Sequence, residues 1–139
     1  MILLDTDTVT LANHGHPQLA ARILAATDEV AITIVSRIEV LRGRWEFLLK
    51  AADGRQLQRA QQLLHEAEQT LNDFATVSID AAAAAEFDRL RQDRKLKKIG
   101  RADLLIAAIA LANRALLVSR NLRHFRQVPG LNVENWADK

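Results

Sequence analysis

The chain has 139 residues, of which 49% are hydrophobic and 26% charged, and its formal net charge is +2. This composition is typical of a folded globular domain, and the absence of cysteine excludes disulfides and thiolate metal sites. No apolar run approaches the roughly 20 residues of a membrane span, and the aliphatic start is too short for a signal peptide. We therefore expect one cytoplasmic domain over residues 1–139.

The chain begins with a short aliphatic stretch, residues 1–4, that predicts a buried strand of a parallel sheet. Two acids, Asp5 and Asp7, follow it directly. Ligands of open α/β sheets bind outside the carboxyl ends of the strands, which makes Asp5 a candidate functional residue. Either acid is also a good helix N-cap, and this alternative is stronger for Asp7 than for Asp5.

A second buried strand is expected at residues 30–35, and Ser36 and Glu39 after it have the spacing of a capping box. Capping alone would explain Glu39, yet the same position brings Glu39 to the edge of the sheet where Asp5 lies. Past a break at Asp53, residues 55–74 form an amphipathic pattern. The two helices predict a hairpin projecting from the sheet, with an apolar stripe that serves as core or as a partner surface.

The second half of the chain continues to alternate strands and helices. We expect, in order, a strand at 76–79, a helix at 81–96, a buried helix at 101–114, a strand at 115–119 and an edge strand at 131–134. Asp80 is a good N-cap, and Asp103 lies in a first helical turn, where the helix dipole stabilises a carboxylate. The overall pattern predicts an α/β fold with a mainly parallel sheet of four to five strands and helices on both faces.

Polar groups from four elements are expected at one rim of this sheet. They are Asp5 with Asp7, then Glu39, Asp103 and Asn121. Clustered carboxylates repel one another unless a cation neutralises them or one takes up a proton. All-oxygen ligands suit Mg²⁺, with Mn²⁺ as a substitute, rather than zinc. We therefore expect a metal site that activates a water for attack on a phosphoryl group.

Basic residues gather in two later stretches. The first holds Arg89, Arg91, Arg94, Lys95, Lys97, Lys98 and Arg101 against Asp93, and the second holds Arg114, Arg120, Arg123 and Arg126. Such clusters are typical of phosphate-binding surfaces, although a solvated helix face is the alternative for each. The candidate RNA-binding residues are Arg94, Lys95, Lys97, Lys98, Arg101, Arg120 and Arg123.

The sequence resembles the PIN-domain ribonucleases, and more closely the VapC toxins of type II toxin–antitoxin (VapBC) systems. The matching stretches are residues 3–7, 36–43, 100–107, 118–125 and the tail 128–136. Together they span the chain in the expected order and spacing. The resemblance implies a single PIN domain with a three-layer α/β/α fold.

The resemblance also implies roles for individual residues. Asp5 and Asp103 would be the principal metal ligands, and Glu39 would act on the metal directly or through a water. Asp7 stands where relatives often carry Asn or Ser, so it is a supporting or additional ligand.

Three residues near the fourth strand complete the implied site. Asn121 occupies the position of a fourth acid but brings no charge, which argues against a second tightly bound metal. Ser119 is expected to hydrogen-bond into the cluster. His124 replaces an acid common in relatives and, beside Phe125, is expected to be structural.

The implied activity is metal-dependent hydrolysis of an RNA phosphodiester bond by an activated water. The resemblance further implies a structured target such as a tRNA or rRNA loop, inhibition of translation, neutralisation by a VapB-type antitoxin, a homodimer and a toxin–antitoxin hetero-oligomer. One alternative is a PIN-like RNA-binding or interaction module whose acids only cap helices. Another is a haloacid-dehalogenase-like phosphatase with Asp5 as nucleophile, although Asp103 is followed by Leu104 and Leu105 with no second acid nearby, and the chain is short for that fold.

Overall fold

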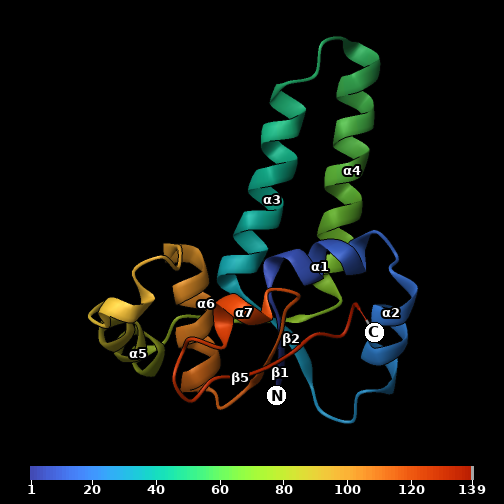
Figure 1. The fold of residues 1–139 in the computed structure, drawn as a ribbon. Coiled ribbons are helices and arrows are strands. Elements are labelled where there is room, and N and C mark those ends of the chain that lie inside the picture. The colour runs from blue at the N-terminus through green and yellow to red at the C-terminus, as the bar shows by residue number, and fades with distance from the viewer. Residues whose placement is uncertain (139) are drawn as a thin grey trace.

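The computed structural model describes residues 1–138 and has a five-stranded sheet at its centre (Figure 1). The strands are β1 (Ile2–Leu4), β2 (Val30–Thr33), β3 (Ala75–Val77), β4 (Leu116–Val118) and β5 (Asn132–Glu134). The helices are α1 (Thr6–Asn13), α2 (Pro17–Ala25), α3 (Ile34–Leu49), α4 (Gly54–Asn72), α5 (Ala81–Arg91), the 3₁₀ turn η1 (Arg94–Leu96), α6 (Arg101–Ala112) and α7 (Leu122–Phe125). The predicted α/β class is confirmed.

The strands run in the order β3-β2-β1-β4-β5, and every neighbouring pair is parallel. Leu4 at the end of β1 pairs with Ile32 on one side and with Val118 on the other. The chain therefore leaves β1 toward one side of the sheet and later returns on the opposite side as β4. This reversal is a topological switch point, where ligand sites of parallel sheets form outside the carboxyl ends of the strands.

Alternating side chains of the central strands bury into two separate cores, because successive residues of a strand face opposite sides. Leu3 and Leu117 pack in one core with Ile106 of α6. Leu4 packs in the other core with Leu19 of α2. The sheet is thus covered on both faces, and the predicted three-layer α/β/α architecture is confirmed.

Helices α3 and α4 form the expected hairpin, which projects away from the sheet (Figure 1). Asp53 caps α4 by accepting a hydrogen bond from the backbone N–H of Gln56 at 2.9 Å. The buried residues of α4 are small or lie near its base, whereas Trp45 and Phe47 of α3 are 53% and 52% exposed. The hairpin therefore leaves large apolar side chains on its surface. Among residues 1–138, no helix combines the length and hydropathy needed to cross a membrane.

Several predicted boundaries are wrong by one or more residues, and for two of them the capping side chains give the reason. Strand β2 ends at Thr33 rather than at residue 35, because the Thr33 hydroxyl accepts a hydrogen bond from the Ser36 N–H at 3.1 Å and starts α3 earlier. Ser36 and Glu39 consequently lie inside the helix and form no capping box. Helix α5 ends at Arg91 rather than at residue 96, because Asp93 caps the separate turn η1 through the Lys95 N–H.

Candidate functional site

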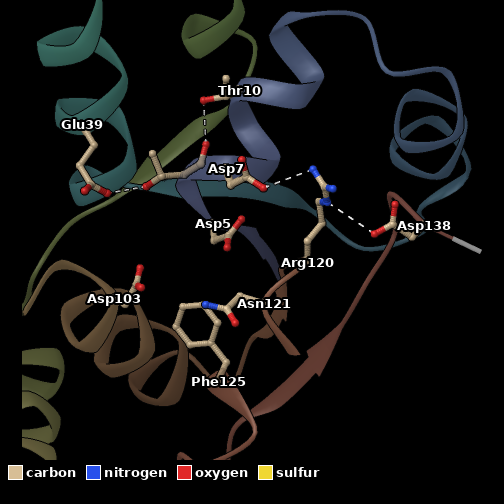
Figure 2. Close-up of a pocket in the computed structure, with 10 residues that line it drawn as sticks. Asp5, Asp7, Thr10, Glu39, Asp103, Arg120, Asn121, Phe125 and Asp138 are labelled. Atoms are coloured by element: carbon tan, nitrogen blue, oxygen red, sulfur yellow. Dashed lines mark hydrogen bonds and ion pairs between the residues drawn. The ribbon is translucent and has the colours of Figure 1, made fainter. Parts of the chain in front are cut away.

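A pocket of about 820 Å³ opens at the carboxyl ends of β1 and β4, the switch point of the sheet (Figure 2). Its lining residues are Asp5, Thr6, Asp7, Thr10, Glu39, Asp103, Arg120, Asn121, Phe125 and Asp138. The structure therefore brings Asp5, Asp7, Glu39, Asp103 and Asn121 around one cavity, although they come from distant parts of the chain.

Asp5 lies at the junction of β1 and α1 and is 6% exposed. Its backbone N–H donates to the Val118 carbonyl at 3.0 Å, and its Oδ1 accepts from the Thr8 N–H at 2.9 Å. Asp5 is therefore the N-cap of α1, whereas Asp7, the stronger N-cap candidate in the sequence, lies exposed in the first helical turn. Burial raises the pKa of Asp5, while hydrogen bonding to Ser119 and Thr8 opposes the rise.

Glu39 reaches the pocket from the first part of α3. Its Oε1 accepts a hydrogen bond from the Thr6 hydroxyl at 2.5 Å (Figure 2). The same hydroxyl lies 3.0 Å from the Ser36 Oγ. Thr6, which sequence reasoning did not single out, thus holds Glu39 toward α1. Because Glu39 is not part of a capping box, local helix capping does not account for its position.

Asp103 faces the same cavity from the first turn of α6. Burial raises its pKa, His124 opposes this rise, and the negative charges of Asp5 and Glu39 reinforce it. The charges of Asp5 and Glu39 therefore act on Asp103 across the cavity. Asp103 Oδ2 lies 3.2 Å from His124 Nε2, a buried atom with no well-aligned hydrogen-bond partner among residues 1–138. His124, expected to be structural, lies against a candidate ligand.

The oxygen donors suit a hard divalent cation. Burial and the negative charges of Asp5 and Glu39 raise the pKa of Asp103, and such a cation would relieve the repulsion from these two charges. Within residues 1–138, however, no three Asp, Glu or His side chains converge closely enough to hold one ion. Each carboxylate instead contacts its own protein group: Thr8 for Asp5, Thr6 for Glu39 and His124 for Asp103. The donor chemistry fits Mg²⁺ or Mn²⁺, and binding by all three would require these side chains to turn toward one another.

Arg120 enters the pocket from the segment after β4. Its Nη1 lies 3.8 Å from Asp7 Oδ2, and its Nε lies 3.5 Å from Asp138 Oδ2. No local sequence pattern points to Asp138, because it comes from the tail beyond the last strand and reaches the pocket only through the tertiary fold. Beside Arg120, the backbone N–H of Asn121 donates to the Ser119 hydroxyl oxygen at 2.9 Å.

The other candidate RNA-binding residues do not line this pocket. Arg94, Lys95, Lys97 and Lys98 are exposed in the segment between α5 and α6, which the buried side chains of Leu96 and Ile99 attach to the core. Arg101 stacks on the ring of Phe87, with its Cζ 5.1 Å from the ring centroid, and Arg123 is exposed on α7. Of the seven candidates, Arg120 alone contributes to the pocket wall.

Asp5 caps helix α1 and also carries a buried negative charge. Substitutions of Asp5, studied in the presence of a chelator, separate these two roles. Asp5→Asn retains an N-cap acceptor but removes the buried charge, so we expect it to raise the melting temperature at pH 7. Since the pKa of folded Asp5 lies above its ordinary value of 3.8, the cost of the charge disappears as the pH falls through that pKa. The advantage of Asp5→Asn should therefore shrink between pH 7 and pH 4.

Asp5→Ala removes both the charge and the cap, and it should be less stable than Asp5→Asn by about 1 kcal/mol. Thermal and urea unfolding followed by circular dichroism measure both differences. Equal stability of the Asn and Ala variants would contradict the capping role, and a pH-independent difference between Asp5→Asn and the parent would contradict the buried-charge role.

Comparison with known proteins agrees with this arrangement. The family model described as PIN domain matches residues 2–131. The chain is 28% identical over 139 residues to a protein from Rickettsia felis named Ribonuclease VapC2, covering 96% of each chain. It is 26% identical over 138 residues to the tRNA(fMet)-specific endonuclease VapC of Salmonella typhimurium, covering 97% of each.

Solved structures show the same fold. A structure of VapBC2 from Rickettsia felis bound to a promoter DNA fragment matches with a TM-score of 0.75 and 28% identity, over 98% of this chain and 99% of that one. A DNA-bound VapBC from Salmonella typhimurium matches with a TM-score of 0.79 at 24% identity, over 98% and 99% of the two chains. Because the family model spans nearly the whole chain, the protein belongs to the PIN domain family.

Proposed function

We propose that the protein is a metal-dependent endoribonuclease toxin of the VapC type that hydrolyses phosphodiester bonds in structured RNA. The observation that carries the proposal is the pocket that holds Asp5, Glu39 and Asp103 together at the switch point of a PIN fold, where burial and the charges of Asp5 and Glu39 raise the pKa of Asp103. The names of the two relatives, a ribonuclease and a tRNA(fMet)-specific endonuclease, support RNA as the substrate class. A tRNA or rRNA loop is the proposed target, with inhibition of translation in the cytoplasm as the consequence.

The proposed cofactor is Mg²⁺, with Mn²⁺ as a substitute. Asp5 and Asp103 would hold it, Glu39 would contribute directly or through a water, and Asp7 is an additional candidate. When bound, such an ion lowers the pKa of a water and stabilises negative charge on a phosphoryl oxygen. Since Arg120 lies 3.8 Å from Asp7, it competes with a cation for that carboxylate, which favours a supporting role for Asp7.

Thr6, Glu39 and Asn121 have different proposed roles, which follow from where each lies in the pocket. Thr6 holds Glu39 through Oε1 and leaves Oε2 to accept a hydrogen bond from an attacking water. Asn121 presents a neutral amide at the pocket, where its N–H groups can donate to a phosphate oxygen without adding repulsion. Binding and positioning are thus assigned to different side chains.

Asp5→Asn and Asp103→Asn should each reduce cleavage of RNA in Mg²⁺ or Mn²⁺ by more than about 100-fold, because each removes a charged ligand. Cleavage of purified tRNA and rRNA, followed by mapping of the new ends, measures this loss. Glu68→Gln on the exposed surface of α4 is the matched control and should cleave like the parent.

The same variants test the metal directly. Mg²⁺ or Mn²⁺ should raise the melting temperature of the parent and have a smaller effect on Asp5→Asn and Asp103→Asn. Undiminished cleavage by either variant would contradict the mechanism. Binding of RNA by the parent without cleavage would favour the non-catalytic module.

The haloacid-dehalogenase alternative, with Asp5 as a covalent nucleophile, loses its basis because the chain belongs to the PIN family.

The exposed basic segment between α5 and α6 is proposed to attract the RNA backbone toward the pocket. It leads directly into α6, whose first turn carries Asp103. Replacing Arg94, Lys95, Lys97 and Lys98 together with Gln should weaken RNA binding and flatten its dependence on salt, because fewer counterions are released. Fluorescence anisotropy at several salt concentrations measures the slope, and an unchanged slope would exclude this segment from RNA binding.

Two apolar surfaces support the proposed protein partners. The exposed Trp45 and Phe47 of the hairpin offer a surface for a VapB-type antitoxin, in a toxin–antitoxin hetero-oligomer. A separate groove of about 400 Å³ beside Glu39, lined in part by Val35, Ile79 and Leu105, is proposed to contact a second copy of the chain.

Light scattering should therefore give the mass of a homodimer, and Ile79→Glu should shift the protein to monomer by introducing a charge into the apolar contact. Leu24→Glu introduces the same charge at an exposed apolar position on α2, where Leu24 is 87% exposed against 44% for Ile79, and this control should remain dimeric. A monomeric parent, or a dimeric Ile79→Glu variant, would contradict this surface.

A further inference from the structure

Arg120 is the one cation among the described residues that line the pocket, and it lies there with five carboxylates. An RNA strand that enters such a pocket meets strong repulsion from Asp5, Asp7, Glu39, Asp103 and Asp138. A bound divalent cation would offset part of this charge at the three inner carboxylates, which are those of Asp5, Glu39 and Asp103. Arg120 is placed to offset it at the mouth.

The guanidinium of Arg120 lies between two acids on opposite sides (Figure 2). Its Nη1 approaches Asp7 at 3.8 Å and its Nε approaches Asp138 at 3.5 Å, so neither of these ion pairs is made through Nη2. The side chain is 46% exposed, so a solvent-borne ligand can reach it. A planar guanidinium with remaining donors matches the oxygens of a phosphate in a two-pronged contact.

The tail fixes the position of Asp138. Trp136 is buried in the core and donates through Nε1 to Glu134 at 3.1 Å. Asn135 donates from Nδ2 to Asp138 Oδ2 at 3.0 Å, and its Oδ1 accepts from the N–H groups of Ala137 and Asp138. Hydrogen bonding from Asn135 and then the charge of Arg120 lower the pKa of Asp138. Asp138 therefore contacts Arg120 from an anchored turn.

We propose that Arg120 anchors a phosphate of the bound RNA strand, and that Asp7 and the tail residue Asp138 hold its guanidinium across the mouth of the pocket. This inference rests on the proposed ribonuclease function and adds to it the residue that binds the substrate backbone. The two ion pairs are solvent-exposed and weak, so a phosphate can share the guanidinium without displacing a buried contact. Asp7 and Asp138 are positioning residues in this scheme.

The binding test uses fluorescein-labelled tRNA and the Asp103→Asn background, which prevents cleavage. Arg120→Ala should weaken binding by about tenfold and reduce the salt slope by about one, because one phosphate contact is lost. Arg120→Lys should recover part of the affinity, since it keeps the charge but not the planar fork. Arg55→Ala, which removes the same charge from the exposed start of α4 at the tip of the hairpin, should stay within about twofold of its parent.

Kinetics in the otherwise unchanged enzyme separate anchoring from chemistry. Arg120→Ala should raise KM with little change in kcat, because it removes binding that is common to substrate and transition state. Circular dichroism and the melting temperature establish that each variant is folded. An affinity and KM equal to those of the parent would overturn the role of Arg120, and a loss confined to kcat would also contradict anchoring.

The role of the tail is tested with Asp138→Ala and Asp138→Asn. If Asp138 positions Arg120, the Ala variant should bind RNA about threefold more weakly although it removes a negative charge, and Asn should restore part of the loss as a neutral acceptor. Stronger binding by Asp138→Ala would mean that Asp138 only repels RNA, which would overturn its positioning role.

The outcomes distinguish this inference from the proposed function. A parent protein that binds and cleaves RNA, with an Arg120→Ala variant that behaves identically, refutes the inference and leaves the function standing. A parent protein that neither binds nor cleaves RNA refutes both.

Discussion

The N-terminal Asp5 links the sheet, the first helix and the pocket through one side chain and one peptide group. Its N–H continues the hydrogen bonding between β1 and β4, and its carboxylate caps α1 through Thr8. The same carboxylate is buried, where its charge is costly. The local structure thus keeps an acid at a place where folding alone would favour a neutral cap, and this is the constraint on which the site depends.

The neighbouring acids are held by a similar arrangement. Thr6 follows Asp5 directly and restrains Glu39, so the first turn of α1 fixes two of the three inner carboxylates. Asp103 comes from the opposite side of the pocket, beside His124. Each acid has its own partner, which keeps like charges apart. A cation that replaced these partners would draw the acids together, so the restraints and the proposed metal act on the same side chains.

Charge is distributed unevenly around the pocket. The inner wall is acidic, one arginine lies at the mouth, and the exposed basic segment before α6 is separate from the pocket wall. Such a separation lets long-range attraction bring a polyanion to the surface while the acids remain free for a cation. The tail takes part because Trp136 anchors it in one of the two cores and thereby places Asp138 near Arg120.

Periodicity and strand-end chemistry were sufficient to predict the α/β class, the projecting hairpin and the elements that carry Asp5, Glu39, Asp103 and Asn121. Buried parallel strands are continuous apolar runs, and amphipathic helices repeat at 3.6 residues, so both are legible locally. The predicted helix starts were wrong where two nearby side chains could each act as the N-cap. Thr33 began α3 in place of Ser36, and Asp5 rather than Asp7 capped α1.

The contacts within the pocket depended on the tertiary structure. The contact of Thr6 with Glu39, of His124 with Asp103 and of Asp138 with Arg120 each joins segments that no local pattern relates. Their proximity follows from the strand order β3-β2-β1-β4-β5, which places the ends of β1 and β4 side by side. The sequence by itself therefore determined which chemical groups the strand ends carry. The crossing of the chain at β1 determined which of those groups meet, because that crossing depends on packing over the whole domain.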